Sequence, residues 1–462
     1  MFRSLFIVAL FVILGLSTSN CKKNGTSAGN LQFSQDTILF DTVFTTLGNA
    51  TRNIRIYNPD KNKIIIEEIE LMGGASSPFS INVDGTSADY IENIHINGED
   101  SLFLFAQVIL DVNNQNLPMV VEDSIRFRTN GVDQYVHLIV WGQDAYFHVN
   151  EVVSGVWNND KPHIIYGTAA VGYPGIDSNL NLTINSGTQV HFYNESSLIV
   201  YKSTLNIAGS PCGGEVVFQG TRLESFYDNL PGQYYGLGII QGIDCTIDGL
   251  IMKNSAYGIT VDSTNSTGYA LTLTNSIVQQ SEFYNLRGQR SGTMDVNNCI
   301  FSNAGIYSVW LGSGRDYRFQ NVTVANHWSG TRQTPGFVLQ NWEYTSSAIY
   351  IYPLDNAEFY NCSFTGNIDN EFIIDTLNGG TVNYGFFNCL LKNETPYGSG
   401  FTSCLWNMDP LFNDPSTYDF KYPINSPLSG NGTIFAPNLF AIDLDCKART
   451  NPIDIGAYDD PQ

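Results

Sequence analysis

The chain has 462 residues, with 22 Lys and Arg against 44 Asp and Glu, so its formal net charge is −22. So acidic a chain is a poor partner for nucleic acid, because binding to nucleic acid depends on Lys and Arg that neutralise phosphates. Charged residues are only 14% of the chain, aromatic residues are 13%, and glycines number 42. This composition favours a β-rich protein with many turns over a helical one.

The first twenty residues predict a signal peptide, in which Arg3 precedes an apolar run at residues 5–16 that is too short to span a membrane. Cys21 follows, and this order resembles the lipobox of bacterial lipoproteins, where the cysteine carries the lipid. The resemblance implies an outer-membrane lipoprotein that faces the periplasm or the cell surface, with residues 21–33 as its tether. The alternative is cleavage by the general signal peptidase, which leaves Cys21 as a plain thiol.

The other seven cysteines show no CxxC pair and no cluster with histidine, so the sequence gives no support for a zinc site. Export permits disulfides. We nevertheless expect most of these cysteines to be buried free thiols that pack as small apolar residues. They are Cys212, Cys245, Cys299, Cys362, Cys389, Cys404 and Cys446.

Residues 34–147 alternate short apolar runs with turn residues, which predicts about seven strands and an antiparallel β-sandwich. The runs at residues 40–43, 53–59 and 79–81 resemble a bacterial immunoglobulin-like family related to domains of abnormal-spindle and hydin-type proteins. The resemblance implies a spacer or an interaction module. No catalytic set of residues is visible in this part of the chain.

Residues 148–408 contain a repeated phrase, in which a polar or aromatic residue precedes Asn, a small or apolar residue and two β-forming residues. The key asparagines are Asn275, Asn298, Asn321, Asn361 and Asn388. Steps in the twenties predict a β-solenoid in which the asparagines of successive coils stack in one column. The small or apolar residue after each Asn is then expected to point into the core. One longer step predicts an outward insertion near residues 329–347.

The segments 182–192, 197–200, 203–209 and 216–218 resemble the opening coils of right-handed parallel β-helix proteins of bacterial surfaces. The expected fold is therefore all-β, with an N-terminal immunoglobulin-like sandwich, a right-handed parallel β-helix of about ten coils and a C-terminal cap. As a whole the chain resembles a lipoprotein of the Bacteroidota type. That fold hosts lyases, hydrolases, adhesins and spacers alike, so it does not assign an activity.

The tail, residues 409–462, resembles the closing segment of many such proteins, and we expect it to cap the open end of the solenoid. Arg449 is expected to pair with Asp445 or Asp454. A calcium site among Asp443, Asp445 and Asp454 is the sharper alternative, although no tight EF-hand loop is present. Otherwise the sequence implies no cofactor.

The richest candidate surface gathers arginines with aromatic residues on adjacent coils. Arginine binds carboxylates bidentately and aromatic rings stack on sugar faces, so these residue types suit an acidic glycan. The alternative is that they are solvated outer-face residues. The proposed ligand-binding residues are Arg287, Arg290, Arg315, Arg318, His327, Trp328, Arg332 and Trp342, with Tyr307, Trp310 and Tyr344 nearby.

No catalytic residue is assigned, because no acidic cluster recurs at coil spacing and no Ser/His/Asp arrangement is evident. The leading hypothesis is a lipid-anchored envelope protein that binds a glycan or another surface partner without catalysis. A polysaccharide lyase or glycoside hydrolase on the β-helix is the second hypothesis. An adhesin or a structural spacer rod is the third.

Overall fold

The computed structural model describes residues 26–47, 51–111, 119–262, 269–290, 292–344, 348–394, 398–435 and 441–459. The predicted signal peptide and Cys21 lie outside these residues. The chain forms two compact units, which divide between Asp144 and Ala145. No helix among the described residues has the length and apolarity needed to cross a bilayer.

The first unit is a β-sandwich of two five-stranded sheets. One sheet has the order β1 (Gln32–Phe33), β3 (Arg52–Tyr57), β8 (Ser101–Val108), β5 (Phe79–Val83) and β6 (Thr86–Ser87). The other has the order β2 (Thr37–Phe44), β10 (Val132–Gln143), β9 (Met119–Thr129), β4 (Ile64–Leu71) and β7 (Tyr90–Ile96). All pairings are antiparallel except that of β2 with β10. Alternate residues such as Ile54, Ile56, Leu138 and Val140 fill one shared core.

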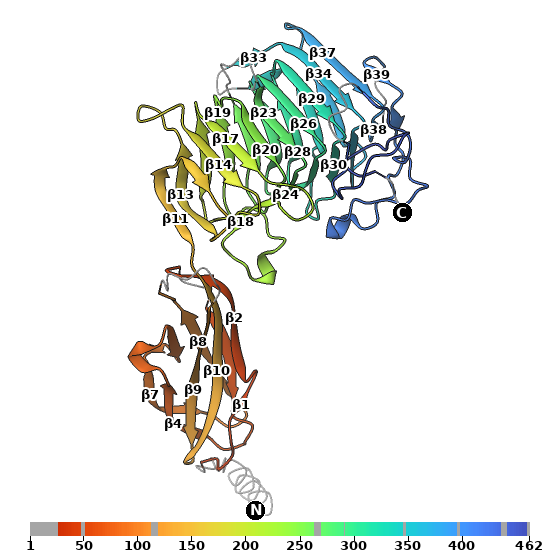
Figure 1. The fold of residues 1–462 in the computed structure, drawn as a ribbon. Helices are drawn as coiled ribbons and strands as arrows, with labels where there is room; N and C mark the ends of the chain where they lie inside the picture. The colour runs from red at the N-terminus through yellow and green to blue at the C-terminus, as the bar shows by residue number, and fades with distance from the viewer. Residues whose placement is uncertain are drawn as a thin grey trace, which may run out of the picture. The chain divides into compact units, whose positions relative to one another are not determined.

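The second unit is a parallel β-helix in which three strands form each regular coil (Figure 1). One strand per coil belongs to a ten-stranded sheet. Its strands are β12 (Gly155–Trp157), β14 (Asn181–Asn185), β17 (Thr204–Ala208), β20 (Cys245–Asp248), β23 (Tyr269–Thr274), β26 (Thr293–Asn297), β29 (Asp316–Gln320), β34 (Leu354–Tyr360), β37 (Val382–Phe387) and β39 (Phe401–Thr402).

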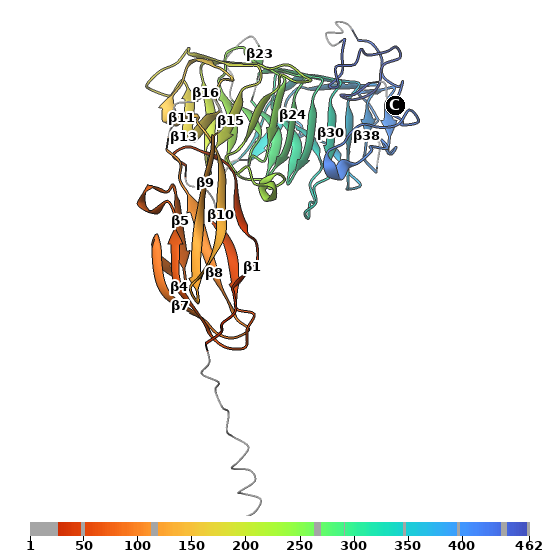
Figure 2. The same cartoon turned by 60° about the horizontal axis from the view of Figure 1, so that its bottom comes forward.

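The other two strands of each coil form two further faces, which we call the first face and the second face. The first-face strands lie side by side (Figure 2): β15 (Gln189–Phe192), β18 (Val216–Gly220), β21 (Leu250–Lys253), β24 (Ile277–Ser281), β27 (Ile300–Ala304), β30 (Thr323–Asn326), β35 (Ser363–Gly366), β38 (Leu390–Leu391) and β40 (Leu405–Trp406). The second face holds β16 (Ser197–Tyr201), β19 (Gly236–Ile240), β22 (Ile259–Asp262), β25 (Tyr284–Gln289), β28 (Tyr307–Gly312), β31 (Phe337–Gln340) and β36 (Phe372–Asp375). The long strands β11 (Tyr146–Val152) and β13 (His163–Val171) begin the solenoid.

The predicted asparagine column is present at the sharp turn from the ten-stranded sheet to the first face. All five asparagines have a left-handed backbone, with φ between 48° and 54°. Asparagine tolerates this conformation better than most residues, because its short polar side chain bonds locally. Nδ2 of Asn298 donates to Oδ1 of Asn275 at 2.7 Å, and Nδ2 of Asn275 donates to Asp248 at 2.7 Å.

The residues that follow the column point into the core, as the repeat predicts. Cys299, Val322, Cys362 and Cys389 are fully buried there. The predicted insertion is also present. It comprises a long loop, residues 327–336, and the hairpin of β32 (Trp342–Tyr344) and β33 (Ile349–Ile351).

The end cap expected at the open end of the solenoid stays a prediction, and the described tail lies along the side of the coils. Thr433 and Asn361 exchange two hydrogen bonds of 2.9 Å, and Asn388 donates to the carbonyl of Asn431. Phe420 and Ala457 pack on outward residues of the first face that include Ile300. Apolar residues point outward on this face, and the tail removes them from water.

One pairing expectation in the tail is wrong. Arg449 does not pair with Asp445 or Asp454; its Nη2 donates to Oδ1 of Asn298 at 2.7 Å, and its nearest carboxylate is Asp459 at 3.8 Å. Cys212 and Cys446 form a disulfide that ties the tail to an earlier turn of the solenoid. The expectation for the other cysteines is confirmed within the described residues, where five are free thiols and four of these are buried.

We predict that Asn298→Ala lowers the free energy of unfolding by about 2–3 kcal/mol. Alanine adopts the left-handed backbone only at a cost in free energy, and it removes the hydrogen bond from Arg449 to Asn298. Asn298→Gly keeps the backbone conformation at no steric cost and loses only the amide contacts. It is therefore expected to lose less than Asn298→Ala. Denaturant midpoints of the two variants compare the effects, and equal losses would contradict the role of the left-handed turn.

Candidate functional site

The outer surface of the second face carries the best-formed candidate site. In-register neighbours on five adjacent strands are Ile199, Gly238, Thr260, Arg287 and Trp310. The next residue on most of these strands, such as Ile239 or Leu311, points inward and is buried. A hollow of about 320 Å³ lies over this row. Gly238 keeps the hollow open, because a Cβ there would approach Cδ1 of Ile199 to 2.9 Å.

An aromatic stripe borders the hollow, and we define it as Tyr235, Tyr257, Tyr284, Tyr307 and Trp310. Successive ring centroids lie 6.3, 6.3 and 6.2 Å apart from Tyr235 to Tyr307, and Trp310 lies 5.3 Å from Tyr284. Tyr235 and Tyr257 remain 46% and 39% exposed. Burial raises the pKa of Tyr284 and of Tyr307, so their phenols stay neutral at ordinary pH. The stripe is an apolar strip with hydrogen-bonding edges, a surface that suits stacking on sugar rings.

Arg287 is held in place beside this stripe. Its guanidinium lies 4.7 Å from the ring centroid of Trp310 and 5.8 Å from that of Tyr284. Its Nη2 donates to Oε1 of Gln289. The side chain is half-buried and lines the hollow. A cation fixed by aromatic rings is placed to meet a carboxylate or a hydroxyl with little loss of side-chain entropy.

Arg290 lies at the edge of the same face in an acidic setting. It is 3.2 Å from Asp262 and 3.7 Å from Glu343, which belongs to the β32–β33 hairpin. This cluster joins two coils to the insertion. Two carboxylates around one guanidinium make Arg290 a less suitable ligand for an anion than Arg287.

The structure does not bring the remaining predicted arginines to this face. Arg315 is exposed at the turn into the ten-stranded sheet, where its backbone N–H donates to Gly292. Arg318 lies on the ten-stranded sheet, where its register neighbours are Asp295 and Glu358. These acidic neighbours give the outer surface there alternating charges.

Arg332 is buried and corrects the proposal that it binds a ligand. Its side chain is 1% exposed and forms a two-pronged pair with Glu371, with contacts of 2.5 and 2.9 Å. Nη2 also donates to the carbonyl of Asn326 and to Asn367. A buried charge needs such partners, so Arg332 serves to fold the loop. Trp328 lies in the same loop, where its carbonyl accepts a bond from Asn367.

His327 and Trp342 also lie away from Arg287. His327 lines a hollow of about 650 Å³ between the first face and the tail, beside Lys392 and Asp409. Burial lowers the pKa of His327 to about 4, so the ring is neutral at ordinary pH. Trp342 is half-buried in the hairpin.

Sequence reasoning named Tyr307 and Trp310 but missed the other three rings of the stripe, although a signal for them exists. Each of Tyr235, Tyr257, Tyr284 and Tyr307 stands two residues before a buried aliphatic residue, namely Leu237, Ile259, Leu286 and Val309. This Tyr-x-aliphatic phrase recurs once per coil in four successive coils. Together with the asparagine repeat, the Tyr-x-aliphatic phrase predicts a row of aromatic rings on the second face.

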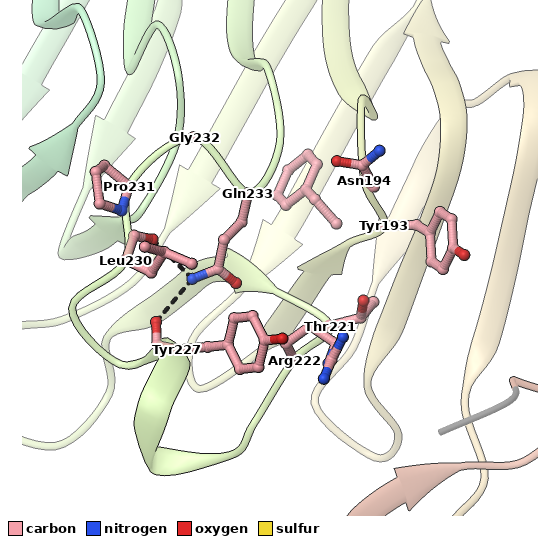
Figure 3. Close-up of a pocket in the computed structure, with 10 residues that line it drawn as sticks. Tyr193, Asn194, Thr221, Arg222, Tyr227, Leu230, Pro231, Gly232 and Gln233 are labelled. Carbon is pink, nitrogen blue, oxygen red and sulfur yellow. Dashed lines mark hydrogen bonds between the residues drawn. The ribbon is translucent and has the colours of Figure 1, made fainter. Parts of the chain in front are cut away.

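A further hollow, of about 300 Å³, lies under the loop of residues 221–235 (Figure 3). Arg222, Tyr227 and Gln233 from the loop line it, together with Tyr193 and Asn194 from the preceding coil. No sequence pattern predicted this hollow.

The structure offers no support for calcium in the tail. Asp443 accepts three backbone N–H bonds, Asp454 accepts from Gly430 and Tyr422, and Asp445 pairs with Lys421. No group of three or more His, Cys, Asp or Glu among the described residues is arranged to hold a metal ion.

No protein-family model matches the sequence, and no curated protein matches it. Solved structures show distant likeness. The catalytic unit of a GH87 α-1,3-glucanase from Streptomyces thermodiastaticus gives a TM-score of 0.25 at 9% identity, over 76% of this chain and 88% of that one.

Two other structures match shorter stretches. The ASH/PapD-like domain of human CEP192 gives a TM-score of 0.17 at 8% identity, over 25% of this chain and 84% of that domain. A family 123 glycoside hydrolase from Clostridium perfringens gives 0.17 at 6% identity, over 24% of this chain. This chain spans about a quarter of that hydrolase, 26%. Because these TM-scores are so low, the activities of these proteins are not used to infer the activity of this chain.

We predict that Arg332→Ala lowers the free energy of unfolding by about 3–5 kcal/mol, because the variant leaves Glu371 buried without its cation. The exposed Arg315→Ala is the matched control and is expected to change stability by about 0.5 kcal/mol or less. Thermal and denaturant unfolding compare the two. Similar losses in both variants would contradict the structural role of Arg332.

Proposed function

We propose that the protein binds a glycan along the second face of its β-helix. The observation that carries the proposal is the aromatic stripe, which presents rings from four successive coils beside an open hollow. Because coils repeat at about 4.8 Å, such a surface can follow an extended chain of rings. Solvent-exposed aromatic rings in a row cost free energy unless a partner covers them, which favours a binding role over an inert rod.

The cation in the hollow favours a glycan that contains uronate. Arg287 is the basic residue that lines the hollow within the described chain, and its contacts there are rings and an amide. A guanidinium bonds strongly to a carboxylate in this geometry. The net charge of −22 repels an anionic chain at long range. At physiological salt this repulsion is screened over about 8 Å, so the attraction between Arg287 and a ligand carboxylate outweighs it at contact.

Binding is proposed without hydrolysis, because the two aspartates of one register row on this face are widely spaced, and the closer pair of Asp262 and Glu343 is held by Arg290. Asp262 and Asp375 stand in one register row, with Gln289, Gly312 and Gln340 on the three strands between them. Four strand spacings place their backbones roughly 19 Å apart. Retaining and inverting glycosidases need carboxyl groups about 5–9.5 Å apart.

We also propose that the protein is held at the bacterial outer membrane by lipid on Cys21, facing the periplasm or the surface. The basis is the lipobox resemblance alone. Metabolic labelling with a fatty acid is expected to mark the wild type and not Cys21→Ala. Equal labelling of the two would remove the anchor from the proposal.

We predict that Arg287→Ala and Trp310→Ala each weaken glycan binding tenfold or more, about 1.4 kcal/mol, because Arg287 lines the hollow and the Trp310 ring holds its guanidinium in place. The matched control is Arg318→Ala, an arginine of another face, which is expected to leave the affinity unchanged. Polygalacturonate, alginate and hyaluronan serve as acidic probes, with dextran as the neutral one, and binding is measured by affinity electrophoresis and calorimetry.

Product assays on the same mixtures test the enzyme alternative. Release of unsaturated uronates or new reducing ends would replace binding with a lyase or a hydrolase. Equal effects of Arg287→Ala and Arg318→Ala would count against the second face as the binding surface.

A further inference from the structure

The loop of residues 221–235, between β18 and β19, is much longer than the fold needs. Only Glu282 and Phe283 join the equivalent strands β24 and β25. The loop includes the short 3-10 helix η2 (Ser225–Tyr227). Its end is anchored by Tyr234, whose buried ring stacks on Phe192 at 4.4 Å. Extended loops on a solenoid commonly form its binding surfaces.

Side-chain amides from three successive coils hold the loop in one conformation. Nε2 of Gln233 donates to the carbonyls of Tyr227 and Leu230 at 2.7 and 2.8 Å (Figure 3). Nδ2 of Asn254 donates to the carbonyls of residues 227 and 228, and Nε2 of Gln280 to that of residue 229. The hollow beneath the loop is therefore formed before any ligand enters, which lowers the entropic cost of binding.

The lining of this hollow combines apolar and polar groups, and its arginine is paired with a buried carboxylate. Nε and Nη2 of Arg222 bond to the two oxygens of Glu224 at 3.1 and 3.0 Å, and Glu224 is buried. The Arg222 guanidinium lies 4.1 Å from the ring centroid of Tyr227. Phe226 extends the apolar rim at the tip of the loop and is 76% exposed. Because Glu224 neutralises the guanidinium, an anion gains little there.

We propose that this hollow is a separate binding site for one neutral sugar ring. Tyr227, Leu230 and Pro231 supply apolar contacts for the ring, and Asn194 and Arg222 supply hydrogen-bonding groups for its hydroxyls. The volume of about 300 Å³ lies at the lower end of the range for small-molecule sites, which suits a single ring better than a chain. The site does not include Arg287, so the proposal does not rest on glycan binding along the second face.

Saturation-transfer NMR on the intact chain tests the site with monosaccharides. The probes are glucose, galactose, mannose, rhamnose, N-acetylglucosamine and the charged control galacturonate. At least one neutral sugar is expected to bind in the millimolar range, and Tyr227→Ala and Asn194→Ala are each expected to weaken it tenfold or more. Tyr227→Phe keeps the ring and is expected to retain binding. Arg287→Ala, on the second face, is the matched control and is expected to leave it unchanged.

Three results would overturn the site: no neutral sugar receives saturation, galacturonate alone does, or Arg287→Ala abolishes the signal as Tyr227→Ala does. Melting curves verify that each variant is folded. If Tyr227→Ala fails to fold, Asn194→Ala carries the test, because Asn194 precedes β16 and does not brace the loop. Monosaccharide binding that persists when polysaccharides do not bind separates this site from the proposed function.

Discussion

The β-helix depends on a backbone conformation that the coils from β20 to β39 adopt at the same point. In each coil from β23 to β37, the strand of the ten-stranded sheet ends in a left-handed asparagine before the first face begins. Gly249 and Ser403 continue the series with φ of 61° and 54°. Side chains alternate between core and surface along a strand, so one extra residue at this turn would invert every following residue of the coil. A uniform turn therefore fixes which residues are buried.

The same column also determines where the tail lies. The side-chain amides of Asn321, Asn361 and Asn388 bond to tail carbonyls, and Oδ1 of Asn298 accepts from Arg449. Once held there, the tail covers the apolar outward residues of the first face. The tail residues of these clusters pack on the first face alone, and Tyr235 and Tyr257 of the second face remain exposed. The tail thus leaves one aromatic face available for a partner, which links the packing of the fold to the proposed site.

Local repetition made much of this fold predictable. Asn275 to Asn388 recur with a small or apolar residue after each, and that pattern predicts stacked coils and the buried phase. Contacts between distant segments were not predictable. From the sequence, Arg332 is expected to be a surface cation. In the structure it pairs with Glu371, which lies 39 residues later in the chain. Cys212 and Cys446 are 234 residues apart, and no local pattern marks them as partners. The loop site was not predicted, because the residues that line it come from two coils. Asn254 and Gln280, which bond to the loop, come from two further coils.

Stacking also limits what chemistry the second face can perform. Residues of one register row are set at increments of about 4.8 Å, so two carboxylates reach catalytic distance only from the same coil or neighbouring ones. Between Asp262 and Asp375 the register row holds two glutamines and a glycine. Asp262 itself forms an ion pair with Arg290. Tyrosines, by contrast, recur coil after coil at the position two residues before each buried aliphatic residue. Repetition of rings along an axis adds contact area with each coil, whereas catalysis needs different groups to converge at one point. The second face has repeated rings along the axis, and this is the physical ground on which we propose that it binds a partner.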